Sequence, residues 1–254
     1  MTLPYPTLAR NAQRGSRPRC VLFTEGSDAV VAERLARLVE PFGEIDADCH
    51  VWMPGGFGQP TEAKLGTAVR LLLSEHREKL TAWWLEVRKG ANTPNWDIAS
   101  TATIDGREGL VLVEAKAHSR EFTTKGQGAG NEQNRQRIRT AVGEADRALK
   151  ELGGEWGLSC DSNFQLANRF AWSWKLASLG IPVVLVYLGF LNADEMRDRG
   201  EPFRTGDEWE RAVRDNATGM VPEKAWEHPL DVGGTPLIPL IRSLELPLAT
   251  TSLP

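Results

Sequence analysis

One dipeptide, Asp105-Gly106, constrains the fold of this chain more than any other feature. It separates two largely apolar segments, residues 96–104 and 109–118. Asp-Gly is the strongest short signal for a two-residue type I′ hairpin turn, because both turn positions need a positive φ. In that register Asp97 lies directly opposite Glu114, whereas a slip of one residue would turn Asp97 away. The sequence therefore predicts an antiparallel hairpin with one carboxylate on each arm.

The charged side chains of this hairpin share one face. Side chains alternate along a strand, so Lys116 projects on the face of Glu114, as does Asp97. Opposed positions bring Cβ atoms to roughly 4.5–5.5 Å, where like charges destabilise a sheet. Residues 110–113 are continuously apolar, which is typical of a buried strand, where a charge needs a partner. The pattern predicts a divalent cation, Mg²⁺ or Mn²⁺, between the carboxylates. The alternative is an ordinary surface ladder pair.

Residues 94–97 and 114–116 together resemble the motifs of the PD-(D/E)XK nuclease superfamily, which has the restriction-endonuclease-like fold. Glu114-Ala115-Lys116 matches the second motif fully, whereas Asn95-Trp96 separates Pro94 from Asp97 in the first. The resemblance spans roughly residues 60 to 190. It implies an α/β (α+β) fold, with a mixed central sheet flanked by helices and with N- and C-terminal elaborations. It also implies that Asp97 and Glu114 bind metal, while Lys116 orients or helps to deprotonate the attacking water.

A further carboxylate is expected from the helix that precedes the strands, because relatives often place an acidic residue there. We predict this helix over residues 61–80. The strand order brings its start near the site, so Glu62 is the candidate metal ligand and Glu75, in the last turn, is less well placed. The alternative for Glu62 is an acid that complements the helix dipole.

Three more polar residues are predicted neighbours of the site. Gln165 and Arg169, one turn apart in a predicted helix over residues 164–179, resemble an auxiliary Gln-x-x-x-Tyr element in which the Tyr is replaced. His118 shares the face of Lys116 and is predicted to be a neighbour of the site instead of a metal ligand.

The apolar spacing and breaker residues predict the remaining elements. Strands are expected over residues 20–23, 50–53, 83–87 and 181–190, and further helices over 28–39, 131–152, 193–199, 206–216 and part of 237–244. We divide the chain into a polar N-terminal arm, residues 1–19, and one domain, residues 20–254. Within that domain the core covers about residues 60–190, and residues 192–254 form a C-terminal elaboration.

Composition limits the functional classes. The three cysteines are scattered, which argues against a disulfide framework and suits a reducing cytosol. No signal peptide or membrane-spanning segment is recognisable, so we expect a cytoplasmic protein without a membrane partner. The net charge is −4, but basic residues exceed acidic ones between residues 107 and 150. This local excess predicts a positive surface for a phosphodiester; a solvated helix of mixed charge is the alternative.

Together these features predict a divalent-metal-dependent phosphodiester hydrolase, a nuclease acting on DNA more than on RNA. The alternative is a non-catalytic module that binds nucleic acid or protein and retains the same fold. Substrate form, sequence specificity, cleavage polarity and oligomeric state, including a homodimer, are left open by the sequence.

Overall fold

The Asp105-Gly106 turn fixes the centre of the sheet. In the computed structural model, which describes residues 5–122 and 125–248, Asp105 and Gly106 have φ angles of 52° and 67°. Strands β4 (Ile98–Ile104) and β5 (Arg107–Lys116) pair antiparallel, and the first pair beyond the turn is Ile104 with Arg107. The predicted two-residue turn and its register are confirmed.

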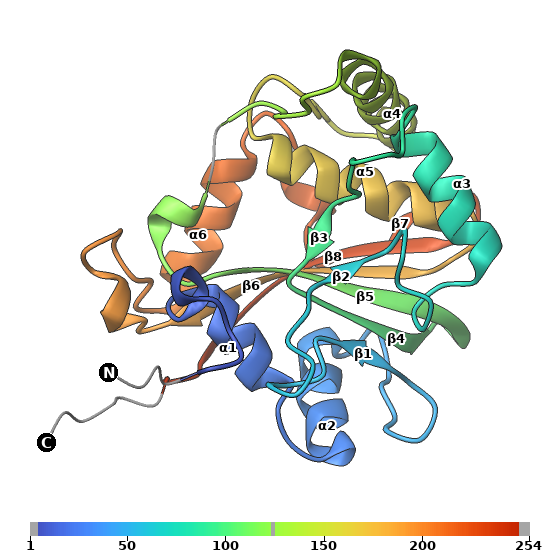
Figure 1. Cartoon of the computed structure of the whole chain (residues 1–254). Helices are drawn as coiled ribbons and strands as arrows, with labels where there is room; N and C mark the ends of the chain where they lie inside the picture. Colours follow the sequence, from blue (N-terminus) through green and yellow to red (C-terminus); the bar gives the residue numbers. More distant parts are fainter. Residues whose placement is uncertain (1–4, 123–124, 249–254) are drawn as a thin grey trace, which may run out of the picture.

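Six strands form one mixed sheet (Figure 1). Its first half is antiparallel, because β1 (Trp52–Met53) pairs with β4 and β4 with β5. Its second half is parallel, since β5 pairs with β6 (Val183–Leu191) and β6 with β8 (Pro236–Glu245). The short β7 (Leu230–Asp231) closes that edge, and β2 (Ala63–Lys64) and β3 (Asn95–Trp96) form a separate two-stranded pair.

Helices cover both faces of this sheet, so the predicted fold class is confirmed. Leu110 and Leu112 of β5 pack into a core cluster with α3 (Ser74–Trp84), α4 (Glu132–Glu151), α5 (Phe164–Ser178) and α6 (Gly206–Ala217). Val111 and Val113 enter a second cluster with α1 (Ser16–Phe23) and α2 (Asp28–Val39) on the opposite face (Figure 1). Alternate side chains of β5 thus pack into two different core clusters, one on each face of the sheet. Four short 3₁₀ turns complete the elements: η1 (Arg10–Ala12), η2 (Ser119–Glu121), η3 (Asp194–Met196) and η4 (Glu223–Ala225).

The predicted helix over residues 61–80 and strand over 83–87 are wrong. Residues 61–73 contain β2 and turns, and the helix is α3, whose last turn includes the two tryptophans of the expected strand. The apolar spacing predicted a buried helix face that includes Val69 and Leu73, but these side chains are 69% and 67% exposed. At Gly66 an added Cβ would meet side-chain atoms of Thr81 and Thr93 at 2.9 Å, so the chain turns tightly there.

The expected order of elements, a helix, three antiparallel strands, helices and a further strand, is nevertheless present, but different segments of the chain form its first helix and first strand. Helix α2 and strand β1 precede β4 and β5, and α4 and α5 lead to the parallel strand β6. The helices predicted over 28–39, 131–152, 164–179 and 206–216 are confirmed to within two residues, as is the strand over 181–190. Of the stretch 193–199 only η3 is helical.

Three predictions near the ends of the chain are wrong. Residues 20–23 belong to helix α1, and residues 237–244 lie in strand β8 instead of a helix. Pro239 has no backbone N–H to donate to a neighbouring strand. Strand β8 tolerates it because β7 pairs only with the first two residues of β8, so no strand pairs with the outer edge at Pro239. The described part of the predicted polar arm is packed, with Tyr5 and Leu8 buried; residues 1–4 lie outside the described residues.

No helix within residues 5–122 and 125–248 is long and apolar enough to cross a membrane.

The hairpin gives a test at two glycines. In Gly106→Ala the added Cβ meets no atom, so only the positive φ is penalised, by about 1 kcal/mol of unfolding free energy. In Gly109→Ala the Cβ would lie 2.6 Å from the Pro182 carbonyl oxygen, so we expect a loss of about 2–3 kcal/mol from overpacking. Urea unfolding of both variants measures the difference. Equal losses would contradict this account of the hairpin.

Candidate active site

Asp97 lies where the β4–β5 ladder ends. It follows β3 and precedes β4, and its Oδ2 accepts a hydrogen bond of 2.8 Å from the backbone N–H of Ala115. This contact keeps the half-buried carboxylate beside Glu114, as the register predicted. Asp97 Oδ1 accepts no hydrogen bond from the part of the chain that the structure describes.

Glu114 is the most enclosed charge of the site, with an exposed fraction of 1%. Its Oε1 accepts hydrogen bonds from the Lys116 ammonium and from Gln165 Nε2 at 2.6 Å. Its Oε2 accepts from Arg169, whose Nε and Nη2 both lie at 2.6 Å. Two cations and one amide therefore occupy this carboxylate.

These contacts determine the charge states of Glu114 and Lys116. Burial opposes ionisation of Glu114, but Arg169 and Lys116 outweigh it and hold the pKa of Glu114 below its usual value. Burial likewise opposes the charged form of Lys116, yet Glu114 and Asp97 raise the pKa of Lys116 above its usual value. At neutral pH Glu114 is therefore a carboxylate and Lys116 an ammonium.

Asp97 has the opposite behaviour. Burial and, next, the charge of Glu114 raise the pKa of Asp97 to about 7, although Lys116, the Ala115 N–H and Arg169 partly offset them. The positive groups nearby already bond to Glu114, so Asp97 is left short of positive charge. Two carboxylates whose pKa values are driven apart by their surroundings are typical of functional sites.

Helix α5 supplies the support of Glu114. Gln165 and Arg169 are four residues apart, so they project from one face of the helix toward Glu114. Gln165 Oε1 also accepts a hydrogen bond of 3.0 Å from Lys116 Nζ, and the Arg169 guanidinium lies 4.5 Å from the centre of the Trp96 ring. The two residues predicted to be auxiliary thus contact the predicted centre directly.

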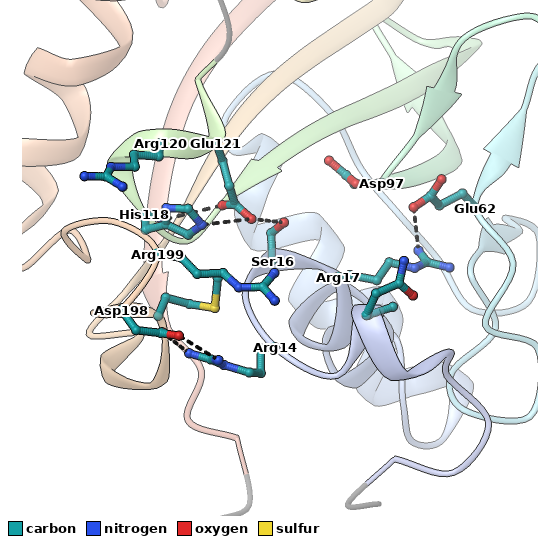
Figure 2. A pocket seen from close by; sticks show the side chains of 13 residues that line it. Arg14, Ser16, Arg17, Glu62, Asp97, His118, Arg120, Glu121, Asp198 and Arg199 are labelled. Atoms are coloured by element: carbon teal, nitrogen blue, oxygen red, sulfur yellow. Dashed lines mark hydrogen bonds and ion pairs between the residues drawn. The ribbon is translucent and has the colours of Figure 1, made fainter.

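Asp97 opens onto a cavity of about 800 Å³. In Figure 2, Asp97, Glu62 and Arg17 lie on one side of it, and His118 and Glu121 lie on the other. The cavity is built from the N-terminal segment, the loop before β2, the end of β5 with η2, and the segment around η3. Its lining residues are Asn11, Ala12, Arg14, Ser16, Arg17, Glu62, Asp97, His118, Arg120, Glu121, Met196, Asp198 and Arg199.

Glu62 and His118 both line this cavity, but Glu62 reaches it by a route that differs from the one expected. Glu62 is not in a helix; it precedes β2, pairs with Arg17 at 3.3 Å and accepts 2.7 Å from Asn95 Nδ2. Glu75 lies in the first turn of α3 and does not line the cavity, whereas Glu62 does. His118 is buried, with Nε2 3.9 Å from Glu121 Oε1.

Four arginines of the cavity were not predicted as site residues. Arg14 pairs with Asp198 and Arg17 with Glu62, whereas the side chains of Arg120 and Arg199 form no hydrogen bond or ion pair with the described residues. For Arg14 and Arg17 the available signal was the basic character of residues 10–19, which we assigned to a polar N-terminal arm. The fold instead brings this segment against the end of β5, where α1 contacts the strand.

Within residues 107–150 the expected positive charge is largely neutralised on helix α4, whereas Arg120 of η2 has no ion-pair partner among the described residues. On α4, Arg135 pairs with Glu132, Lys150 with Asp146, and Arg139 with Asp161 at 2.7 Å. This helix therefore fits the alternative of a solvated face of mixed charge, and the cationic groups near Asp97 come from other segments.

Within residues 5–122 and 125–248, no three His, Cys, Asp or Glu side chains gather closely enough to bind a metal ion by themselves. Comparison of the chain with protein-family models, curated proteins and solved structures found no match.

The raised pKa of Asp97 predicts a stability that depends on pH. Between about pH 4 and 7 folded Asp97 keeps a proton that the unfolded chain releases, so rising pH destabilises the fold across this window. Asp97→Asn cannot ionise and its amide oxygen can still accept the Ala115 N–H. We expect the variant to gain about 2 kcal/mol of unfolding free energy near pH 8, allowing for screening of a half-buried group, and almost none near pH 4. Denaturant unfolding at both pH values checks this; an equal gain at both would contradict it.

Glu114→Gln should behave in the opposite way. The variant leaves the ammonium of Lys116 and the guanidinium of Arg169 buried without the carboxylate to which both bond, so we expect a loss of about 3–5 kcal/mol near pH 8. Thermal unfolding beside Asp97→Asn provides the comparison. A Glu114→Gln variant as stable as the wild type would show that these ion pairs do not hold the centre together.

Proposed function

We propose that the protein is a divalent-metal-dependent phosphodiester hydrolase of the PD-(D/E)XK type that acts on nucleic acid, DNA more than RNA. The observation that carries this proposal is the meeting of Asp97, Glu114 and Lys116 at the end of the β4–β5 hairpin, beside a cavity lined by four arginines. The mixed sheet with helices on both faces agrees with the fold that this type implies.

Asp97 fits the requirements of a cation ligand. Its Oδ1 accepts no hydrogen bond from described residues, and burial and the nearby charge of Glu114 raise its pKa to about 7, so a cation beside it would stabilise the charged form. Glu62 lines the same cavity, and one or two carboxylates with several waters suffice for Mg²⁺. Glu114 can join them only if Lys116 or Gln165 releases its Oε1. A divalent cation at Asp97 would polarise the phosphodiester and lower the pKa of water.

Of the two roles predicted for Lys116, orienting the water and helping to deprotonate it, only the first suits its charge state. Because Glu114 and Asp97 keep it protonated, Lys116 is a hydrogen-bond donor and not a base at neutral pH. It can orient the attacking water or stabilise the negative charge that develops on the phosphoryl oxygens. Glu114, in turn, positions the Lys116 ammonium, and Arg169 and Gln165 position Glu114.

The arginines of the cavity suit a polyanionic substrate. The side chains of Arg120 and Arg199 are without ion-pair partners in the described part of the chain, so their donors remain available to phosphate oxygens. Four carboxylates line the same cavity, so attraction of a phosphodiester depends on these two arginines and on a cation bound at Asp97.

A non-catalytic binding module is the second candidate, and one observation favours it. Both oxygens of Glu114 are occupied by groups of the chain itself, so the centre is held together without a metal. In such a module the arginines would still bind phosphates, and no bond would be cleaved.

Calorimetric titration with Mn²⁺ distinguishes the two candidates. For the hydrolase we expect wild-type protein to bind Mn²⁺, and Asp97→Ala to lose the binding together with Mn²⁺-dependent cleavage of DNA. Below pH 7 the affinity should fall by up to about tenfold per pH unit, because Asp97 must release its proton before it binds the cation.

Glu75→Ala is the matched control, since this carboxylate lies at the start of α3 away from the cavity. It should bind and cleave as the wild type does. Cleavage by Asp97→Ala at the wild-type rate, or wild-type protein that neither binds Mn²⁺ nor cleaves, would exclude the hydrolase.

A further inference from the structure

A second cavity, of about 330 Å³, adjoins the same centre. Two of its lining residues connect it to the site: Gln165 bonds to both Glu114 and Lys116, and Asn95 donates to Glu62, which lines the first cavity. The proposed reaction centre therefore lies between two chambers of different character. The first contains four arginines, whereas half of the residues that line the second are amides or aromatic residues.

The donors and acceptors of this second cavity are uncharged. Arg169 also lines it, but its guanidinium already bonds to Glu114 and to Asn168 Oδ1, the latter at 2.8 Å. Asn168 has an exposed fraction of only 8%, and its Nδ2 has no hydrogen-bond partner among the described residues. Because this donor is not among the atoms that are both buried and unpartnered, it is open to the cavity and can bond to an acceptor on an occupant.

Aromatic rings form another part of the wall. The rings of Trp84 and Phe164 lie nearly parallel, with an interplanar angle of 18° and centroids 6.3 Å apart, and both residues line the cavity. Trp84 is only 2% exposed, so the half-buried ring of Phe164 is the face available to a flat heterocycle, whose edges can bond to Asn or Gln.

We propose that this cavity holds one unpaired nucleobase of the substrate, next to the phosphodiester that lies at Asp97. The inference rests on the proposed function and narrows its substrate to single-stranded nucleic acid or to a strand with an extruded nucleotide. The volume is at the lower limit of ligand pockets and suits one nucleoside, whereas a base pair would not enter it.

Base-dependent binding tests the proposal in an Asp97→Asn background, which is expected not to cleave. Fluorescence anisotropy compares a short single-stranded DNA, the same strand with abasic residues, and the corresponding duplex. Because stacking of one base contributes a substantial part of such binding, we expect the intact single strand to bind about tenfold more tightly than either of the others.

Two variants should abolish that preference. Asn168→Ala removes the free amide donor, and Gly128→Leu places a side chain at the cavity wall, where an added Cβ meets no atom and the chain can accept it. Gly130→Leu, in the same loop, is the matched control: its Cβ also meets no atom, but Gly130 does not line this cavity, so the preference should remain.

Equal binding of intact and abasic strands, or an unchanged preference in Gly128→Leu, would overturn the nucleobase site. The proposed function is judged separately, from Mn²⁺-dependent cleavage by the protein with native Asp97. Cleavage without base preference leaves the hydrolase and removes this inference; base preference without cleavage leaves a single-strand binding module.

Discussion

The buried carboxylate of Glu114, held between the Lys116 ammonium and the Arg169 guanidinium, is the interaction on which the centre depends. It joins strand β5 to helix α5 on one side of the sheet and fixes the positions of Gln165 and Lys116. A charge this deep is tolerated only with such partners. Because Lys116 and Arg169 both bond to Glu114, they stabilise its charge more than that of Asp97. The pKa of Glu114 is therefore lowered, whereas the pKa of Asp97 is raised. One organises the site, and the other is available to react or bind.

The sequence predicted well what depends on local chemistry. The Asp-Gly turn specifies its backbone geometry by itself, so the register of β4 and β5, and with it the approach of Asp97 to Glu114, could be obtained without a structure. Long helices with periodic apolar residues, such as α2 and α4, could be predicted equally well. The placement of Gln165 and Arg169 followed from their spacing on one helix together with the resemblance to a nuclease motif.

The remainder depended on long-range packing. Residues 61–73 have helical apolar spacing, but they are held by β3 and by the close contact at Gly66, which local patterns do not reveal. Part of residues 237–244 was predicted to be helical, although pairing with β6 makes this segment the strand β8. The arginines of the cavity could not be assigned because Arg14 and Arg17 meet Asp198 and Glu62 only in the folded chain. Charge counted along the sequence pointed instead to α4, whose cations are mostly paired.

The wall of the larger cavity joins segments that lie far apart in the sequence. Arg14 contacts Asp198, and Arg19, buried in α1, contacts Glu195. Asp97, Glu114 and Lys116 precede these acidic residues in the chain by about eighty residues or more. On the ribosome, therefore, the reactive groups emerge well before the surface that encloses them can form. A growing chain that has reached strand β5 carries the motif without its cavity, whose wall is complete only after the segment around η3 has been added.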